Sequence, residues 1–169
     1  FLSGEDIHTV TASQVFGVPT EAVTKQMRSH AKAVNFGIVY GISDFTLAKN
    51  ISVTRAEARD FMERYFARYP GVKRFMDEAV RLGHERGYAR TLLGRRRYLP
   101  ELKSGNYNVR AFGERCAMNS PIQGTAADII KLAMIRVFEA LRAQDLRARL
   151  ILQVHDELIV EAPEDEAGR

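Results

Sequence analysis

Four side chains in the segment RSHAKAVNFGIVYG, residues 28–41, are spaced so that they could bind one elongated anion together. If the segment is helical, Arg28, Lys32, Phe36 and Tyr40 share one stripe, because residues four apart are neighbours on a helix. Two like charges one turn apart destabilise an isolated helix by about 0.2–0.5 kcal/mol, and a polyanion between them would remove that cost. The stripe spans about 18 Å in a helix, the order of length of an extended nucleoside triphosphate. The spacing therefore suits a nucleotide-binding face, in which the basic end would hold the phosphates and the aromatic end would meet the sugar and base.

The opposite side of the same helix is apolar. Met27, Ala31, Val34 and Ile38 recur at helical spacing and suffice to dock the helix on a core. The basic and aromatic stripe is then expected to face away from that core. A solvated basic face with two rings packed on a neighbouring helix satisfies the same spacing, so spacing alone leaves both interpretations open.

A second group with possible chemistry lies near the end of the chain, in QVHDELIV. His155, Asp156 and Glu157 fall between two β-rich runs, at the bend of a predicted hairpin. Mg²⁺ is usually held by one or two carboxylates together with substrate phosphates, and flanking strands would give it a rigid mount. Neighbouring strand residues point to opposite faces, so one of the two carboxylates is expected to be the direct ligand. The alternative is a hairpin turn that is polar only because turns are polar.

The composition fits a globular protein with a basic surface. The chain has 169 residues, 46% of them hydrophobic and 27% charged, which suits one unit or two small lobes with a real core. It contains no apolar run long enough to span a membrane and no signal peptide, and a single cysteine, Cys116, fits a reducing compartment. We therefore expect a cytoplasmic protein with no membrane partner. The net charge is +4, and 19 of the 25 basic residues are arginine, whose planar fork suits phosphate.

The pattern along the chain predicts an α+β fold in which helices dominate. Gly17, Gly41 and the Pro70–Gly71 pair mark helix ends, and Thr54 has the spacing of a capping box with Glu57. The expected helices cover residues 6–16, 20–40, 43–50, 54–69, 71–86, 107–119 and 125–143, and the expected strands cover 88–93, 94–100, 147–154 and 157–162. Four short strands make an incomplete sheet. We expect the chain to be a fragment of a larger protein.

The order and separation of these motifs resemble the family A DNA polymerases, the group of bacterial DNA polymerase I. The resemblance rests on RSHAKAVNFGIVYG followed by QVHDE, and on DIHTVTA, TLLGRRRYLPEL and ERCAMNSPIQGTAADIIKLAM between and around them. It covers nearly the whole chain. It implies mainly helical fingers at 1–87, with a nucleotide-binding helix at about 21–40. Residues 88–169 would supply the rest of the fingers and a partial antiparallel palm sheet carrying the catalytic hairpin. The thumb, the upstream palm motif and the C-terminal end of the palm would be absent.

The resemblance assigns the stripe to the incoming deoxynucleoside triphosphate. Arg28 and Lys32 match phosphate-contacting positions, and Lys32 also counts among the catalytic residues. Phe36 matches the ring against the sugar, and Tyr40 lies at the base end. His155 is implied to lie near the nucleotide at the primer end.

The same resemblance makes Asp156 the metal-binding catalytic carboxylate, with Glu157 as its catalytic neighbour. Two Mg²⁺ ions bridged by carboxylates from two palm motifs drive nucleotidyl transfer in this chemistry. This sequence supplies one of the two motifs, and its carboxylate partner is not identifiable here. The fragment alone is therefore expected to be inactive, as part of a longer, monomeric polymerase of DNA replication and repair.

Primer–template DNA is the second implied partner. The residues that the resemblance places against it are Gly41, Ser43, Arg115, Asn119 and Gln123. Arg115, Asn119 and Gln123 match minor-groove contacts, where acceptors common to all base pairs allow a test of pair shape. Residues 120–123, SPIQ, also have the spacing of a capping box, which is an alternative use for Gln123. The Arg run at 95–97 is expected to be solvated charge or a contact to the DNA backbone.

Two other functions stay open at this level. A single-subunit RNA polymerase relative would carry a similar basic fingers helix with a Tyr-Gly end, and the residue that excludes ribose lies outside this sequence. A non-catalytic nucleic-acid-binding module would use the basic surface alone, and neither a matched nucleotide nor Asp156 would matter to it.

Overall fold

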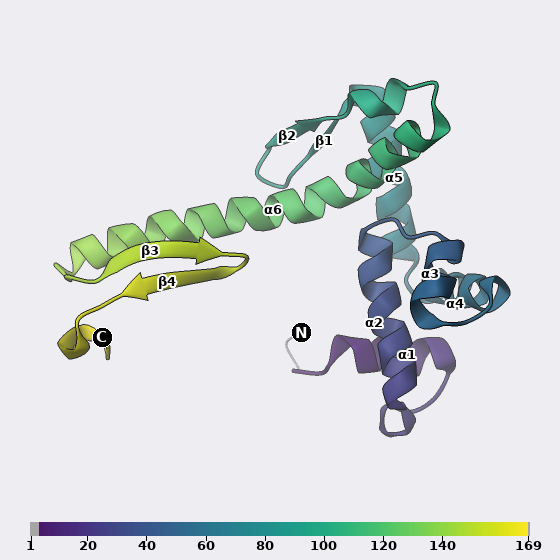
Figure 1. The fold of residues 1–169 in the computed structure, drawn as a ribbon, viewed down its shortest axis with the longest axis horizontal. Coiled ribbons are helices and arrows are strands. Elements are labelled where there is room, and N and C mark those ends of the chain that lie inside the picture. Colours follow the sequence, from purple (N-terminus) through teal and green to yellow (C-terminus); the bar gives the residue numbers. More distant parts are fainter. Residues whose placement is uncertain (1–3, 169) are drawn as a thin grey trace. The chain divides into compact units, whose positions relative to one another are not determined.

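A computed structural model describes residues 4–168, which divide into two units. Unit 1 consists of the chain up to Ala89 together with Arg97–Asn119, and unit 2 consists of Arg90–Arg96 together with the chain from Ser120 onward. Each unit is described by itself below. Helices predominate, with two separate two-stranded sheets, so the expected α+β class is confirmed (Figure 1).

The first helix of unit 1, α1 (Ile7–Phe16), lies where the sequence predicts it. Asp6 caps its start, since the carboxylate accepts hydrogen bonds from the backbone N–H groups of His8 and Thr9. Gly17 ends it in the left-handed conformation.

The nucleotide-binding candidate helix, α2 (Lys25–Val39), is shorter than predicted. A separate 3₁₀ turn covers Thr20–Ala22, and Thr24 then caps α2 by accepting a hydrogen bond from the N–H of Met27. The prediction of a helix from residue 20 was wrong because Thr20 and Thr24 are both of a residue type that can begin a helix, and it is Thr24 that caps the α-helix. Gly41, at φ 67°, ends the helix as expected.

Three further helices of unit 1 follow the predicted capping signals. They are α3 (Asp44–Ile51), α4 (Arg55–Arg68) and α5 (Pro70–Arg86). Ser43 caps α3, and Thr54 and Glu57 form a capping box with both of its reciprocal hydrogen bonds. Pro70 occupies the first position of α5, where its missing N–H costs nothing.

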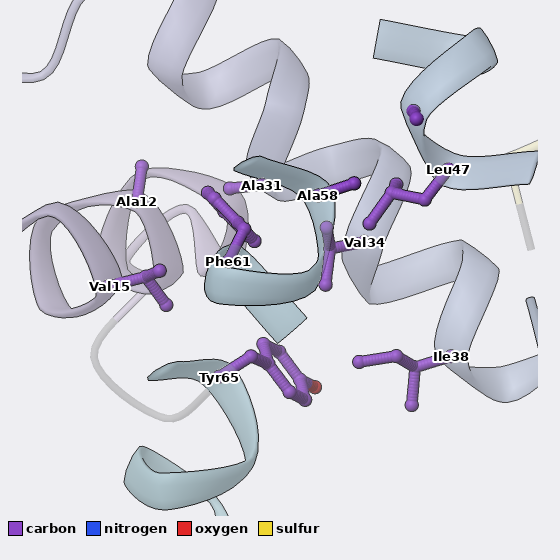
Figure 2. Packing of buried hydrophobic residues seen from close by; sticks show 10 residues of the cluster. Ala12, Val15, Ala31, Val34, Ile38, Leu47, Ala58, Phe61 and Tyr65 are labelled. Atoms are coloured by element: carbon purple, nitrogen blue, oxygen red, sulfur yellow. The ribbon is translucent and has the colours of Figure 1, made fainter. Parts of the chain in front are cut away.

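The main core of unit 1 lies among α1, α2, α3 and α4. Its buried residues are Ala12, Val15, Ala31, Val34, Ile38, Leu47, Ala48, Ala58, Phe61 and Tyr65 (Figure 2). The apolar side of α2 therefore faces this core, as its sequence pattern predicts. A smaller buried cluster of the same unit contains Ala89, Leu99, Leu102, Cys116 and Ala117.

The two short strands after α5 are β1 (Tyr88–Arg90) and β2 (Arg96–Tyr98), which pair with each other. Gly94 turns the chain between them at φ 92°. A 3₁₀ turn at Pro100–Lys103 follows. The predicted strand pair around a glycine turn is confirmed, with shorter strands.

A single helix, α6 (Tyr107–Ala143), replaces the two helices predicted at 107–119 and 125–143. Pro121 lies inside it, and the Thr125 hydroxyl donates to the Pro121 carbonyl at 2.5 Å. The helix has a glycine at position 124 because Thr91 packs closely against it. A Cβ added there would stand 2.6 Å from Thr91 Cγ2. The expected break at Pro121 and Gly124 was therefore wrong, and so was the capping box at residues 120–123, since the helix does not begin there.

Unit 2 contains the second predicted hairpin. Strands β3 (Arg149–Val154) and β4 (Glu157–Glu161) are antiparallel, with Val154 opposite Glu157 and a register irregularity between Leu150 and Leu152. In Figure 1 this hairpin runs beside the C-terminal half of α6. Six large apolar side chains on these elements are each 45–59% exposed, namely Ile129, Leu132, Ile135, Phe138, Ile151 and Leu152.

Candidate functional site

The stripe on α2 has the orientation that the sequence predicts. Arg28, Lys32, Phe36 and Tyr40 are all exposed, and the Phe36 and Tyr40 side chains retain 53% and 52% of their accessible surface. On the other side of the helix, Ala31, Val34 and Ile38 are buried and Met27 is partly buried. Two exposed aromatic rings in line with two cations leave a surface that can meet a ligand carrying both phosphates and an aromatic base.

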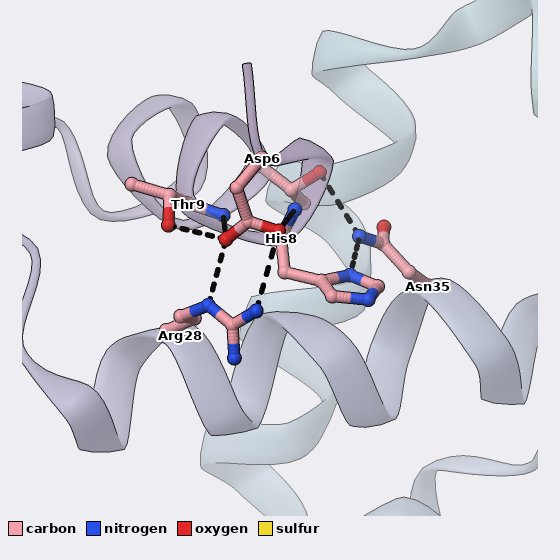
Figure 3. Close-up of polar contacts among 6 residues, drawn as sticks. Asp6, His8, Thr9, Arg28 and Asn35 are labelled. Carbon is pink, nitrogen blue, oxygen red and sulfur yellow. Dashed lines mark hydrogen bonds and ion pairs between the residues drawn. The ribbon is translucent and has the colours of Figure 1, made fainter. Parts of the chain in front are cut away.

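Arg28 is held by an acidic residue from the start of α1. Its Nε lies 2.6 Å from Asp6 Oδ2 and its Nη2 lies 3.3 Å from Asp6 Oδ1 (Figure 3). These bonds from Arg28, followed by the hydrogen bond from the Thr9 hydroxyl, hold the pKa of the Asp6 carboxyl well below its ordinary value. The same pair raises the pKa of Arg28, so both groups are charged across the neutral range.

Two residues beside the stripe, His8 and Asn35, had no functional role predicted from the sequence. The His8 ring lies 5.6 Å from the Phe36 ring, centroid to centroid, and Asn35 Nδ2 lies 3.1 Å from His8 Nδ1 (Figure 3). Asn35 Nδ2 also donates to the Thr11 hydroxyl at 3.1 Å. These contacts depend on the packing of α1 against α2, and residue spacing within one helix cannot reveal such packing.

A groove of about 660 Å³ lies at the aromatic end of the stripe, between the end of α2 and α3. Phe36, Tyr40, Gly41, Ser43 and Arg115 are among its lining residues. Two residues expected to meet the nucleotide and three expected to meet DNA thus line a single depression within unit 1. The Ser43 hydroxyl serves as the cap of α3, accepting from the N–H of Thr46 at 3.2 Å.

The N-terminal half of α6 packs on the end of α2, also within unit 1. A Cβ at Gly41 would stand 2.9 Å from Arg115 Cγ. Asn119 is 8% exposed, and its amide donates to the backbone carbonyl of Val39 at 3.3 Å. Arg115 is exposed, whereas the Asn119 amide already holds α6 against α2. Their contact with DNA stays a prediction.

The carboxylate hairpin belongs to unit 2. His155 and Asp156 form the turn and Glu157 begins β4, so the predicted tight bend is confirmed. His155 has φ 52°, a left-handed conformation in which histidine is several-fold enriched among non-glycine residues. Gln153 Nε2 donates to the His155 carbonyl at 2.6 Å, which braces the turn. All three side chains at the bend are exposed.

No cluster of three or more His, Cys, Asp or Glu residues suited to a metal occurs in the described part of the chain. The assignment of Asp156 and Glu157 as metal ligands stays a prediction from the sequence. Gln123, the last of the predicted DNA contacts, is exposed on α6 in the same unit.

A buried polar network in unit 2 was not foreseen from the sequence. Asp128 on α6 is 5% exposed and accepts from the Thr91 hydroxyl at 2.6 Å and from Arg95 Nε at 2.5 Å. The Leu92 N–H donates to the Thr125 hydroxyl at 3.0 Å. Hydrogen bonds from Thr91 and then Arg95 lower the pKa of Asp128. The first arginine of the run at 95–97 therefore pairs with a buried carboxylate while its own side chain stays 56% exposed, and its contact with DNA remains a prediction.

The sequence profile of DNA polymerase family A matches residues 1–169. The chain belongs to DNA polymerase family A. The family A chain is 61% identical to DNA polymerase I of Geobacillus stearothermophilus over all 169 residues, which are 19% of that protein. It is 56% identical to DNA polymerase I of Bacillus subtilis over 166 residues, 98% of this chain and 19% of that protein. It thus spans about a fifth of the length of these relatives.

A solved structure resembles the family A chain closely. The POL domain of Pol1 from M. smegmatis, in complex with DNA primer-template and dNTP, superimposes with a TM-score of 0.91 at 48% identity. The match covers 98% of this chain and 29% of that one. The family model and these relatives confirm the family inferred from the motifs. In the described residues, no helix is both long and apolar enough to cross a lipid bilayer.

Proposed function

We propose that this chain is the nucleotide-binding part of a DNA-directed DNA polymerase and supplies one side of its metal site. The observation that carries the proposal is the exposed line of two cations and two rings on α2, set on a buried apolar face. The family membership and the nucleotide and DNA bound to the M. smegmatis structure support it. Binding a nucleoside triphosphate requires that its phosphates and its base be held along one line, and the stripe provides groups for both.

We further propose that the chain works as a segment of a longer, monomeric polymerase. The relatives are about five times its length, since it matches 19% of each. The large apolar residues exposed on α6 and β3 give this proposal physical support, because exposed apolar side chains gathered on neighbouring elements are typical of an interface. Other parts of the polymerase would cover them, so the isolated chain is not expected to extend a primer.

Within the nucleotide site, each stripe residue has a separate task. Arg28 and Lys32 bind the triphosphate through charge-assisted hydrogen bonds, each contributing about 1.5–3 kcal/mol. Phe36 lies against the sugar, and Tyr40, which lines the groove, lies beside the base. His155 would approach the nucleotide from the primer end, as the resemblance implies.

Mg²⁺ fits the carboxylates at the hairpin bend. Asp156 and Glu157 are exposed oxygen donors on a braced turn, and Mg²⁺ takes one or two carboxylates together with phosphate oxygens. Asp156 would hold the ion, with Glu157 beside it. Bound there, the ion would act as a Lewis acid that neutralises charge on the phosphates during nucleotidyl transfer. The second carboxylate of a two-metal site would come from outside this chain.

Primer–template DNA would contact the groove and the exposed faces of α6. Gly41 and Ser43 line the groove where a template base would lie. Arg115 and Gln123 are exposed, and Asn119 would act from a more buried position. These contacts carry no sequence readout, which is what a polymerase that copies any template needs.

The test is to substitute the cations in the full-length polymerase that carries this chain. Arg28→Ala and Lys32→Ala should each raise the KM for deoxynucleotide by about ten- to a hundredfold, since a charge-assisted contact is lost and 1.36 kcal/mol corresponds to tenfold. Duplex affinity should stay within about twofold. Lys73→Ala is the matched control, because Lys73 is an exposed cation that pairs with Asp77 on α5. Equal losses of duplex affinity in both stripe variants, with KM unchanged, would favour a non-catalytic nucleic-acid-binding module.

A further inference from the structure

Arg28 is not a freely rotating cation, because Asp6 binds one edge of its guanidinium. The two contacts join Nε to Oδ2 at 2.6 Å and Nη2 to Oδ1 at 3.3 Å, so the carboxylate lies side-on (Figure 3). The two residues are 22 positions apart and come from different helices. Their pairing therefore depends on how α1 packs against α2.

Asp6 is itself fixed at the start of α1. Its Oδ2 accepts from the Thr9 N–H at 3.1 Å and from the Thr9 hydroxyl at 2.6 Å, while Oδ1 accepts from the His8 N–H. The Asn35 amide donates to Thr11 and so ties α2 to α1 next to this cap. A carboxylate held in this way sets the direction of the guanidinium that it binds.

The remaining donors of Arg28 match a phosphate. Arginine has five N–H donors, and Asp6 uses one on Nε and one on Nη2. Three remain, and those on Nη1 and Nη2 form the end-on edge of the guanidinium. That edge can bind two phosphate oxygens in parallel, which is the strong bidentate mode. The carboxylate and a phosphate can thus bind the same arginine on different edges.

We infer that Asp6 is a positioning residue for triphosphate recognition: it holds Arg28 so that the end-on edge of the guanidinium is preorganised for phosphate. This inference rests on the proposed nucleotide site. Without Asp6 the long side chain must be ordered when the nucleotide binds, and that ordering weakens binding. Asp6 acts through Arg28 and touches neither the sugar nor the base.

The experiment compares Asp6→Asn with the unchanged full-length polymerase, alone and combined with Arg28→Ala. Asparagine is as good a helix cap as aspartate, so α1 keeps its start while the charge and the anionic partner of Arg28 are lost. The KM for deoxynucleotide should rise about three- to tenfold, the effect of ordering one rotamer-rich side chain, with kcat within about twofold. In the Arg28→Ala background, Asp6→Asn should change KM no further.

Asp60→Asn is the matched control, because Asp60 forms an exposed pair with Arg64 on α4, and it should leave KM unchanged. A lower KM in Asp6→Asn would overturn the inference and make Asp6 a competitor of phosphate for Arg28. A KM rise that persists in the Arg28→Ala background would show that Asp6 acts through α1 alone, and an unchanged KM would show that it positions nothing. If Asp6→Asn lowers the melting temperature, Asp6→Ser, which also caps, takes its place. An unchanged KM in Arg28→Ala alone would instead refute the proposed nucleotide site.

Discussion

The contact of Gly124 on α6 with Thr91 in the 90–96 segment can be tested with one methyl group. A Cβ added at Gly124 would stand 2.6 Å from Thr91 Cγ2, a separation that real Cβ contacts do not show. Thr91 cannot rotate its methyl away without loss, because its hydroxyl donates to Asp128 at 2.6 Å and accepts from the Arg95 N–H at 3.0 Å. We therefore expect Gly124→Ala to be destabilising even though alanine is the better helix former.

The size of the effect follows from two opposing contributions. Overpacking of this kind costs about 1–3 kcal/mol. Replacing glycine by alanine inside a helix gains about 0.8–1.0 kcal/mol. The net loss expected for Gly124→Ala is about 1 kcal/mol. In a Thr91→Ser background the methyl is absent while the hydroxyl remains, so the same substitution should stabilise by about 1 kcal/mol, a coupling of about 2 kcal/mol.

Urea unfolding of the four proteins of this cycle measures the coupling. The midpoint should fall in Gly124→Ala, and it should rise when Gly124→Ala is added to Thr91→Ser, with slopes unchanged. Ala126→Gly on α6 is the control for helix propensity, since Ala126 is exposed and its substitution should cost about 1 kcal/mol in both backgrounds. If Gly124→Ala has the same effect with threonine or serine at position 91, the glycine is not there to admit the Thr91 methyl.

Three other outcomes follow from the site and its charges. In the full-length polymerase, Asp156→Ala should abolish nucleotide addition in Mg²⁺ with duplex binding preserved, because metal stabilisation of the transition state is worth several kcal/mol; single-turnover incorporation above about a tenth of the parent rate would contradict it. Phe36→Tyr should reduce discrimination against dideoxynucleotides by supplying a hydroxyl where the sugar lacks one, and competition between the two nucleotide types measures this. Hydrogen bonding from Arg55 lowers the pKa of Asp44 from 3.8 to about 2, so ionised Asp44 stabilises the fold above pH 3.8 and this contribution disappears as the pH falls through about 2. The melting temperature should therefore fall less between pH 5 and pH 2 in Asp44→Asn than in the parent protein. An equal fall in both proteins would show that the Asp44–Arg55 pair contributes nothing to stability.

Local capping chemistry explains why much of the helical part could be predicted. Ser43, Thr54 and Gly41 act within a few residues of themselves, and each begins or ends a helix where its side chain or its φ requires it. The stripe on α2 could be predicted for a related reason, since 3.6-residue periodicity separates a buried face from an exposed one without knowledge of the partner helices.

The misjudged break in α6 shows where local signals fail. Pro121 and Gly124 both disfavour a helix interior, yet α6 continues through them. Thr125 bonds the Pro121 carbonyl, and Gly124 gives Thr91 room to reach Asp128. The stabilising partner comes from a segment more than 30 residues earlier in the chain, so no window around the proline could contain the evidence. The roles proposed for Asn119 and Gln123 depend on DNA and are untested by the fold.

Two arginines illustrate why residue type alone does not indicate function, and why the burial of the paired carboxylate also matters. Arg28 and Arg95 each bind an aspartate that is distant in the sequence. Asp128, the partner of Arg95, has a side chain only 5% exposed, and a buried carboxylate without a cation would be strongly unfavourable, so Arg95 is bound to a structural task. Asp6, the partner of Arg28, is 39% exposed and is hydrated with or without the arginine, so its pairing does not consume Arg28. The pairing with Asp6 leaves three N–H donors of Arg28 available. Arg28 also shares its exposed stripe with Lys32 and the Phe36 and Tyr40 rings, and this place on α2 makes it the arginine of the two that we propose for the nucleotide.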